Sequence, residues 1–204
     1  NSKFLSSDII TEFRGRGDQI HVYPLSFAEF MSVRNDHPSD AWREYYTFGG
    51  LPHVLALETP NKKIEYLKEI YSTVYVKDIV ERYKLRGEAE LKELLLVISS
   101  AIGSPTNPNK LANTFKSLKN VTLSNKTIDN YLTYFCESFL VNKSIRYDIK
   151  GKKYINTLSK YYFTDVGVRN AILDFRQQEE NHIMENVIYN ELKMRGFQVD
   201  VGMV

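Results

Sequence analysis

The sequence predicts a mainly α protein with a few short strands, of the α+β class. Apolar residues at three-to-four spacing dominate the stretches 61–84 and 88–139, which is typical of amphipathic helices. Strict alternation is confined to short runs such as "SIRYDI", "KYINT" and "FQVDV". The 204 residues are 43% hydrophobic and 25% charged, a balance that predicts a packed core.

Composition excludes several classes of protein. The net charge is only +2, and the single cysteine, Cys136, leaves no partner for a disulfide and no thiolate set for zinc. The four histidines lie far apart in the sequence, so no metal site is expected from them. No apolar run reaches the roughly 18 residues that span a bilayer, and no signal peptide is evident, so we expect no membrane partner and a cytoplasmic location. The first residue is not methionine and the last run resembles a strand, so we expect a fragment.

The first sixty residues predict short elements. Residues 4–13 favour a helix that Gly15 and Gly17 interrupt, and "QIHVYPL" favours a strand that Pro24 ends. Ser26, followed by Glu29 three positions later, forms a capping-box pattern at the start of a new helix. The pair Gly49-Gly50 predicts a turn; a phosphate site is the alternative, but no Lys-Ser/Thr follows the pair. Residues 61–84 then predict one long amphipathic helix.

Residues 88–165 predict a winged helix-turn-helix. "ELKELLLVISSAIG", "NPNKLANTFK" and "SNKTIDNYLTYFCESFLV" read as three successive helices, the last capped by Ser124 or Asn125. Two short strands follow, joined by a turn with Gly151 at its tip. In such a module the third helix faces DNA and the hairpin lies beside it, against the backbone or the minor groove.

Local charge bears on what this module binds. The hairpin region carries six basic residues, including Lys143 and Lys160, and one acid, Asp148, and such an excess favours contact with phosphates. Asp129 and Glu137 on the third helix oppose such contact, so a protein-binding or scaffolding role stays open. Cys136 lies near the apolar face of that helix and reads as an inert core thiol. The candidate DNA-binding residues are Lys126, Arg146, Lys150, Lys152 and Lys153.

The last forty residues predict two helices and a strand. The helices fall near 166–175 and 180–195, and Gly196 is a suitable stop for the second. Met184, Val187 or Ile188, and Leu192 form the stripe that we expect to be buried. "FQVDV" alternates as a strand at the end of the sequence.

Several motifs in a fixed order resemble a known family. The motifs are "GRG…I.V.PLSF.EF", "Y..FGGLP.V", "YL..IY..V..KDI..R", "T...YL.YF..SFLV", "KYYF.D.GVRNAIL" and "EN.IYNEL..RGF.VDVG". Together they resemble the C-terminal portion of prokaryotic AAA+-type, archaeal-ATPase-like P-loop ATPases that carry a C-terminal domain of unknown function. The resemblance implies four parts: residues 1–30 as a remnant of the ATPase core, 31–87 as a helical linker segment, 88–165 as the winged helix, and 166–204 as the start of a truncated, restriction-endonuclease-like α/β domain.

The resemblance also implies candidate site residues. Arg16 corresponds to an arginine finger that reaches the nucleotide of a neighbouring subunit, and Arg14 is a weaker candidate for that role. Glu185 corresponds to a helix carboxylate of the nuclease-like fold, but the metal-binding strand that would follow it is missing from this sequence. No G-x-x-x-x-G-K-S/T motif is present, so this fragment is expected to hold no cofactor, with ATP and Mg²⁺ bound by the full-length protein. Its expected partners are DNA and neighbouring ATPase subunits.

A second function from a different class stays open. The chain could be an ATP-independent winged-helix DNA-binding or regulatory protein whose likeness to the ATPases is only ancestral. Neither hypothesis expects this fragment to be catalytic. If the resemblance to the ATPases holds, the parent protein would be an ATPase.

Overall fold

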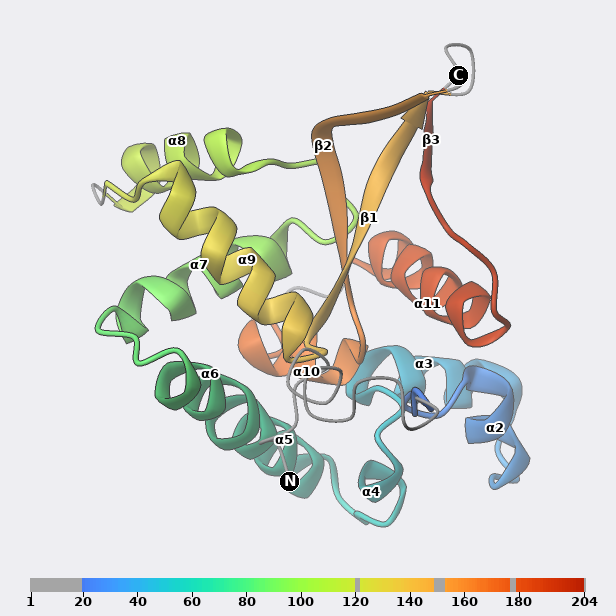
Figure 1. Cartoon of the computed structure of the whole chain (residues 1–204). Coiled ribbons are helices and arrows are strands. Elements are labelled where there is room, and N and C mark those ends of the chain that lie inside the picture. The colour runs from blue at the N-terminus through green and yellow to red at the C-terminus, as the bar shows by residue number, and fades with distance from the viewer. Residues whose placement is uncertain (1–19, 120–121, 149–152, 177–178, 204) are drawn as a thin grey trace.

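The chain is mainly helical and carries a small three-stranded mixed sheet (Figure 1). The computed structural model describes residues 20–119, 122–148, 153–176 and 179–203. The helix predicted for residues 4–13 lies outside these ranges. Among the described helices, none is long and apolar enough to cross a membrane.

The N-terminal third holds three short helices, α2 (Phe27–Ser32), α3 (Pro38–Phe48) and α4 (Pro52–Leu55). The predicted capping box is confirmed at α2: Ser26 Oγ accepts a hydrogen bond from the backbone N–H of Glu29, and Glu29 Oε2 accepts one from the backbone N–H of Ser26. Helix α3 was not predicted, although Pro38 starts it at a position that suits proline. The strand predicted at "QIHVYPL" is wrong for the described residues 20–25, which form no strand.

The long helix predicted for residues 61–84 is confirmed as one continuous helical stretch with an unexpected middle. It consists of α5 (Pro60–Glu69), the π-helix η1 (Ile70–Val76) and α6 (Lys77–Arg82). A π-helix turns more widely than an α-helix and therefore shifts the apolar stripe around the axis. The apolar spacing alone did not reveal this change.

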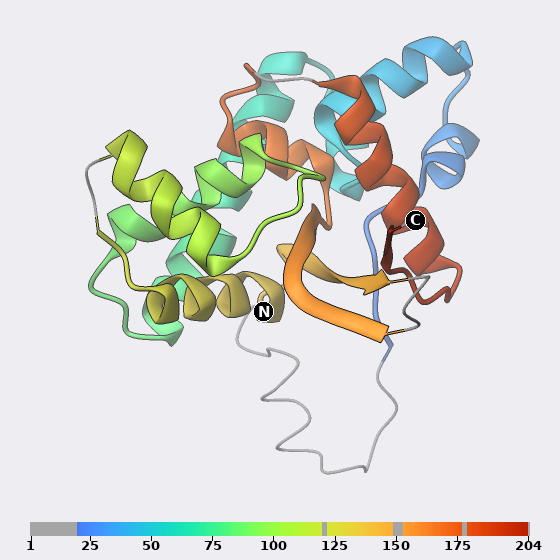
Figure 2. The ribbon, with the colours of Figure 1, turned by 90° about the horizontal axis from the view of Figure 1, so that it is seen from above.

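Three helices and a hairpin follow, in the predicted order: α7 (Glu88–Ser100), α8 (Pro108–Lys119), α9 (Asn125–Glu137), β1 (Val141–Asp148) and β2 (Lys153–Phe163). The strands are antiparallel, from the pair Val141–Phe163 to the pair Asp148–Lys153. Thr106 adds a bridge to β2 at Ser159, and β3 (Val201–Met203) lies parallel to β1 on its other side. Figure 2 shows the hairpin from above, between α9 and the last helix, α11 (Glu180–Met194).

Helix α10 (Val166–Ile172) lies at the centre of the molecule, and each of its seven residues is buried. It packs against α3, α5, η1, α7, α11 and β2. One apolar core accordingly runs from Val54 and Leu67 through α7 and α9 to Val168 and Ile172. This core crosses the predicted domain boundaries at 87/88 and 165/166, which stay predictions about the chain's organisation.

A buried polar junction joins α3 to α10. Asp165 caps α10 by accepting from the backbone N–H of Val168 at 3.0 Å, and its other oxygen accepts from the N–H of Gly50 at 2.7 Å. The predicted Gly49-Gly50 turn is confirmed at the end of α3. A Cβ on Gly49, whose φ is 78°, would stand 2.2 Å from a carboxylate oxygen of Asp165. That side chain fills the space beside the turn, so the turn has a structural role.

Two asparagines complete this junction. Asn170 donates to the carbonyls of Tyr46 and Thr47 at 2.8 and 2.9 Å. Asn186 of α11 accepts from the N–H of Phe163 and donates to its carbonyl, at 2.6 and 2.7 Å. The motifs "FGGLP", "D.GVRN" and "EN.IYNEL" thus meet in space and hold the helices together.

Candidate nucleic-acid interface

The first turns of α8 and α9 lie beside each other. Asn107 Oδ1 caps α8 by accepting from the N–H of Lys110 at 2.8 Å. Ser124 Oγ caps α9 by accepting from the N–H of Thr127 at 3.0 Å, as predicted. Asn125 donates a side-chain hydrogen bond to Asn109 across the gap between the two helices. Two positive helix ends therefore face one region of the surface.

A polar cavity of about 660 Å³ opens between these helix starts and the hairpin. Lys126 reaches it from the first turn of α9, and Lys143 reaches it from β1; both side chains are exposed. The sheet side is completed by Ser159 and Tyr161 of β2. The remaining lining residues are Thr106, Asn107, Pro108, Asn109, Asn125 and Asp129.

The charges around this cavity favour an anionic ligand on balance. Two lysine ammonium groups and two helix N-termini are positive, while the exposed Asp129 is the one acid that lines the cavity. The amide and hydroxyl groups can exchange hydrogen bonds with a sugar-phosphate backbone. This arrangement can bind phosphates. The negative charge of Asp129 weakens that binding.

The structure brings together only part of the predicted DNA-binding set. Lys126 lies in the cavity, but Arg146 is half-buried on β1 and lines a separate cavity of about 300 Å³ beside β3. Lys150 and Lys152 lie outside the described residues. Lys153 begins β2, and only its backbone is described.

Lys143 was counted in the basic region but not among the candidate DNA-binding residues, and it lines the same cavity as Lys126. Asn107 and Asn109 were also missed. Their signal was the run "NPNK" at a helix start, where asparagine side chains cap and remain exposed.

The carboxylate of Glu185 is held by two neighbours. Its Oε1 accepts from Lys160 Nζ and from the Tyr162 hydroxyl, both at 2.7 Å. Burial raises the pKa of Glu185, but these hydrogen bonds and the charge of Lys160 leave it below the ordinary value. Within the described ranges, no group of three or more His, Cys, Asp or Glu side chains could hold a metal. Arg14 and Arg16 lie outside those ranges.

Cys136 has the environment of a structural thiol. It packs against the apolar core, and burial raises its pKa to about 11. The thiol is therefore protonated at neutral pH, which makes it a poor nucleophile.

The chain matches one family and two curated relatives. Residues 39–179 match the family described as a domain of unknown function, DUF8612. An uncharacterized protein of Haemophilus influenzae is 35% identical over 99% of this chain, and an uncharacterized protein of Methanocaldococcus jannaschii is 31% identical over 97% of it. The match covers 51% and 46% of those two proteins, so the chain spans about half the length of each. No solved structure matches significantly. Because the family match covers more than half of its residues, the chain belongs to the DUF8612 family.

Proposed function

We propose that the chain is the C-terminal portion of an AAA+-type P-loop ATPase and that residues 88–165 act as a winged helix-turn-helix that binds nucleic acid. The order of α7, α8, α9, β1 and β2 supports the winged-helix assignment. The isolated bridge between Thr106 and Ser159 ties the segment before α8 to the hairpin. The observation that carries the nucleic-acid proposal is the cavity where Lys126 and Lys143 face two helix N-termini.

In this proposal the contact is with the phosphate backbone. Lys126 and Lys143 come from different elements, so they can bind phosphates on the two sides of the cavity. The helix ends add partial positive charge. Each neutralised phosphate releases counterions, so the binding should be weakly sequence-dependent and strongly salt-dependent.

The proposal predicts the effect of removing both lysines. The variant Lys126→Ala/Lys143→Ala should bind a fluorescent duplex of about 30 base pairs at least tenfold more weakly at about 50 mM salt. It should also lower the slope of log affinity against log salt by about 2, since each lost phosphate contact contributes roughly 0.9. Fluorescence anisotropy at several salt concentrations measures both quantities.

The matched control is Lys62→Ala/Lys77→Ala. These lysines are exposed on α5 and α6 and pair only loosely with Glu58 and Glu81, at 4.0 and 3.9 Å. The control removes the same charge away from the cavity and should keep most of the affinity. Equal losses in the two double variants would mean that only net charge matters, and unchanged binding in the first would remove this interface altogether.

The ATPase part of the proposal rests on the ordered motifs and on the length of the relatives. ATP and Mg²⁺ would bind in the other half of the protein, and Arg16, with Arg14 as the weaker candidate, would contact the nucleotide of a neighbouring subunit. Residues 166–204, with Glu185, would begin the nuclease-like domain. Sequencing the gene upstream of residue 1 tests this part. A G-x-x-x-x-G-K-S/T motif supports it, whereas its absence leaves the ATP-independent winged-helix regulator.

A further inference from the structure

One face of α11 is apolar and exposed. The helix buries Ile183, Asn186 and Tyr189, whereas Met184 is 43% exposed and Ile188 is 52% exposed. The prediction that Met184 lies in the buried stripe is therefore wrong, and of the alternatives Val187 and Ile188 it is Val187 that packs against the core. The spacing of Met184 and Ile188 is nevertheless that of a helix face made for packing.

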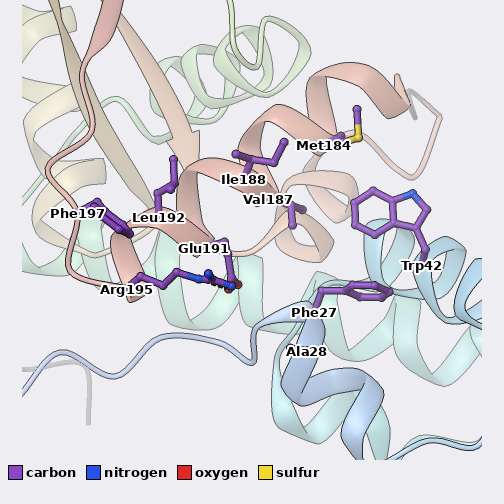
Figure 3. Close-up of a pocket in the computed structure, with 10 residues that line it drawn as sticks. All are labelled: Phe27, Ala28, Trp42, Met184, Val187, Ile188, Glu191, Leu192, Arg195 and Phe197. Atoms are coloured by element: carbon purple, nitrogen blue, oxygen red, sulfur yellow. Dashed lines mark hydrogen bonds and ion pairs between the residues drawn. The ribbon is translucent and has the colours of Figure 1, made fainter.

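This face forms one wall of an apolar groove of about 610 Å³ (Figure 3). Phe27 of α2 and Trp42 of α3 form the opposite wall, and Phe197 lies beyond the C-terminal end of α11. The polar groups of the lining are already paired: Arg195 binds Glu191 at 2.7 Å, and Trp42 Nε1 donates to Glu180 at 2.9 Å. The groove therefore offers shape and apolar surface, with few free polar groups for a small polar ligand.

The segment that leads into α2 passes beside the C-terminal end of α11 (Figure 3), where His21 feels the charge of Lys193. The His21 ring contacts the rings of Tyr23 and Phe139, and partial burial together with the charge of Lys193 lowers the pKa of His21, although the residue as a whole is exposed. Ile20 and Val22 are each 84% exposed. Residues 20–25 pair with no strand among the described residues, so their backbone remains available for pairing.

Most of the exposed large hydrophobic side chains lie on α11, just after it, or on the segment that leads into α2. Seven large hydrophobic side chains are exposed in the described part of the chain, and only Val33 and Val74 lie elsewhere. We call the other five the apolar face: Ile20, Val22, Met184, Ile188 and Phe197. A cluster of this kind marks an interaction surface more often than single exposed residues do.

We propose that the apolar face is the docking surface for a second folded unit of the same polypeptide, one that offers an open sheet edge to residues 20–24 and apolar side chains to the groove. The length of the relatives supports this occupant, because about half of each lies outside the matched region. A small ligand would fill only the groove, and an isolated helix would leave the backbone of residues 20–24 unpaired. A folded unit with a sheet edge can do both: its side chains fill the groove, and its backbone hydrogen-bonds to residues 20–24. The inference holds whether or not that unit is an ATPase.

Hydrogen–deuterium exchange tests the proposal. The complete gene product and the 204-residue chain alone are compared, and peptides covering residues 20–25 and 184–197 should exchange at least tenfold more slowly in the complete product. In that product, Ile188→Asp should return both peptides to the rates of the chain alone, because a carboxylate cannot be buried in an apolar contact without a partner. Circular dichroism of the 204-residue chain with Ile188→Asp checks that the fold survives.

The control is Val74→Asp on η1. Val74 is 39% exposed and lies outside the apolar face, so this change should leave the protection of both peptides intact. Equal exchange in the two proteins, or a complete gene product no longer than the 204 residues, overturns the proposal. A concentration-dependent dimer of the chain alone that protects the same peptides also overturns it, in favour of a second copy. Protection in a product without a P-loop refutes the ATPase proposal while sustaining this one.

Discussion

At the scale of single residues, the ordered motifs have a structural explanation. Asp165, Asn170 and Asn186 are buried, and each bonds to the backbone of another element. Sequence alone predicted the Gly49-Gly50 turn from turn chemistry, but it could not predict that Asp165 fills the space beside that turn. The two segments lie 115 positions apart, and no local pattern encodes their contact. A buried aspartate at a helix start looks in sequence like any exposed cap.

The buried carboxyl of Asp165 predicts a specific pH dependence. Burial raises its pKa to about 6, although the N–H groups of Val168, Gly50, Gly167 and Leu51 act in the opposite direction. The native state thus holds this proton more tightly than the unfolded chain, whose Asp has a pKa near 3.9. Its contribution to the free energy of unfolding is present in full below about pH 4 and is lost as the pH rises through 6.

The variant Asp165→Asn removes this dependence. Between pH 4 and pH 7, the free energy of unfolding of the natural chain should fall relative to the variant by up to roughly 3 kcal/mol. Other carboxylates, such as the ion-paired Glu44, have lowered pKa values and make the free energy of unfolding rise with pH in both proteins. Only the difference between the two proteins therefore reports on Asp165. Urea unfolding at four pH values measures it. Parallel pH profiles for the two proteins would show that Asp165 does not titrate in this range.

At the scale of elements, helical periodicity predicted most helices but not what each one packs against. Helix α9 was predicted with its cap and with a core face of Ile128, Leu132, Phe135 and Phe139. The first three are buried, whereas Phe139 lies beyond the end of the helix and is half-buried. The stripe on α11 was equally clear in the sequence, yet it faces a groove. Periodicity shows that a face is apolar, whereas the identity of the element that covers it depends on tertiary structure.

The packing of α10 against the end of α3 predicts a large effect at one glycine. A Cβ on Gly167 would lie 2.0 Å from the carbonyl oxygen of Phe48 and 2.8 Å from the backbone nitrogen of Gly49. Gly167→Ala should therefore destabilise the protein by about 3 kcal/mol or more, because two backbones must separate. This loss exceeds the roughly 1 kcal/mol that alanine gains over glycine in an ordinary helix.

Gly196→Ala is the comparison for that change. Gly196 has a φ of 81° and open space around it, so the substitution should cost only about 1 kcal/mol, from the left-handed backbone. The urea concentrations at the unfolding midpoints of the two variants and of the natural chain rank their stabilities. If Gly167→Ala were neutral or stabilising, the close contact between α10 and α3 would be absent in solution.

At the scale of the whole molecule, the order of elements was largely predictable and their integration was not. Residues 88–165 read as a self-contained module because three helices and a hairpin follow one another without a break. In the structure, α9 and the hairpin share their core with α5 and α10, which come from either side in the sequence. Contacts between distant segments are set by the whole fold, so sequence order alone could not show that these elements share a core.

This shared core predicts how fragments behave. An isolated 88–165 fragment would lose the core partners Leu67 and Ile79 on one side and Val168 and Ile172 on the other. Several large apolar side chains would become exposed, and each costs about 1.5–3 kcal/mol when it returns to water. Because small domains are stable by only about 5–15 kcal/mol, the fragment should show no cooperative unfolding.

The 204-residue chain should instead unfold in one transition, with coincident midpoints by circular dichroism and by fluorescence of Trp42. Urea titration of the two proteins makes the comparison. A sigmoidal transition in the 88–165 fragment would mean that the module folds alone. In that case the contacts with α5 and α10 would be an interface between domains rather than part of one core.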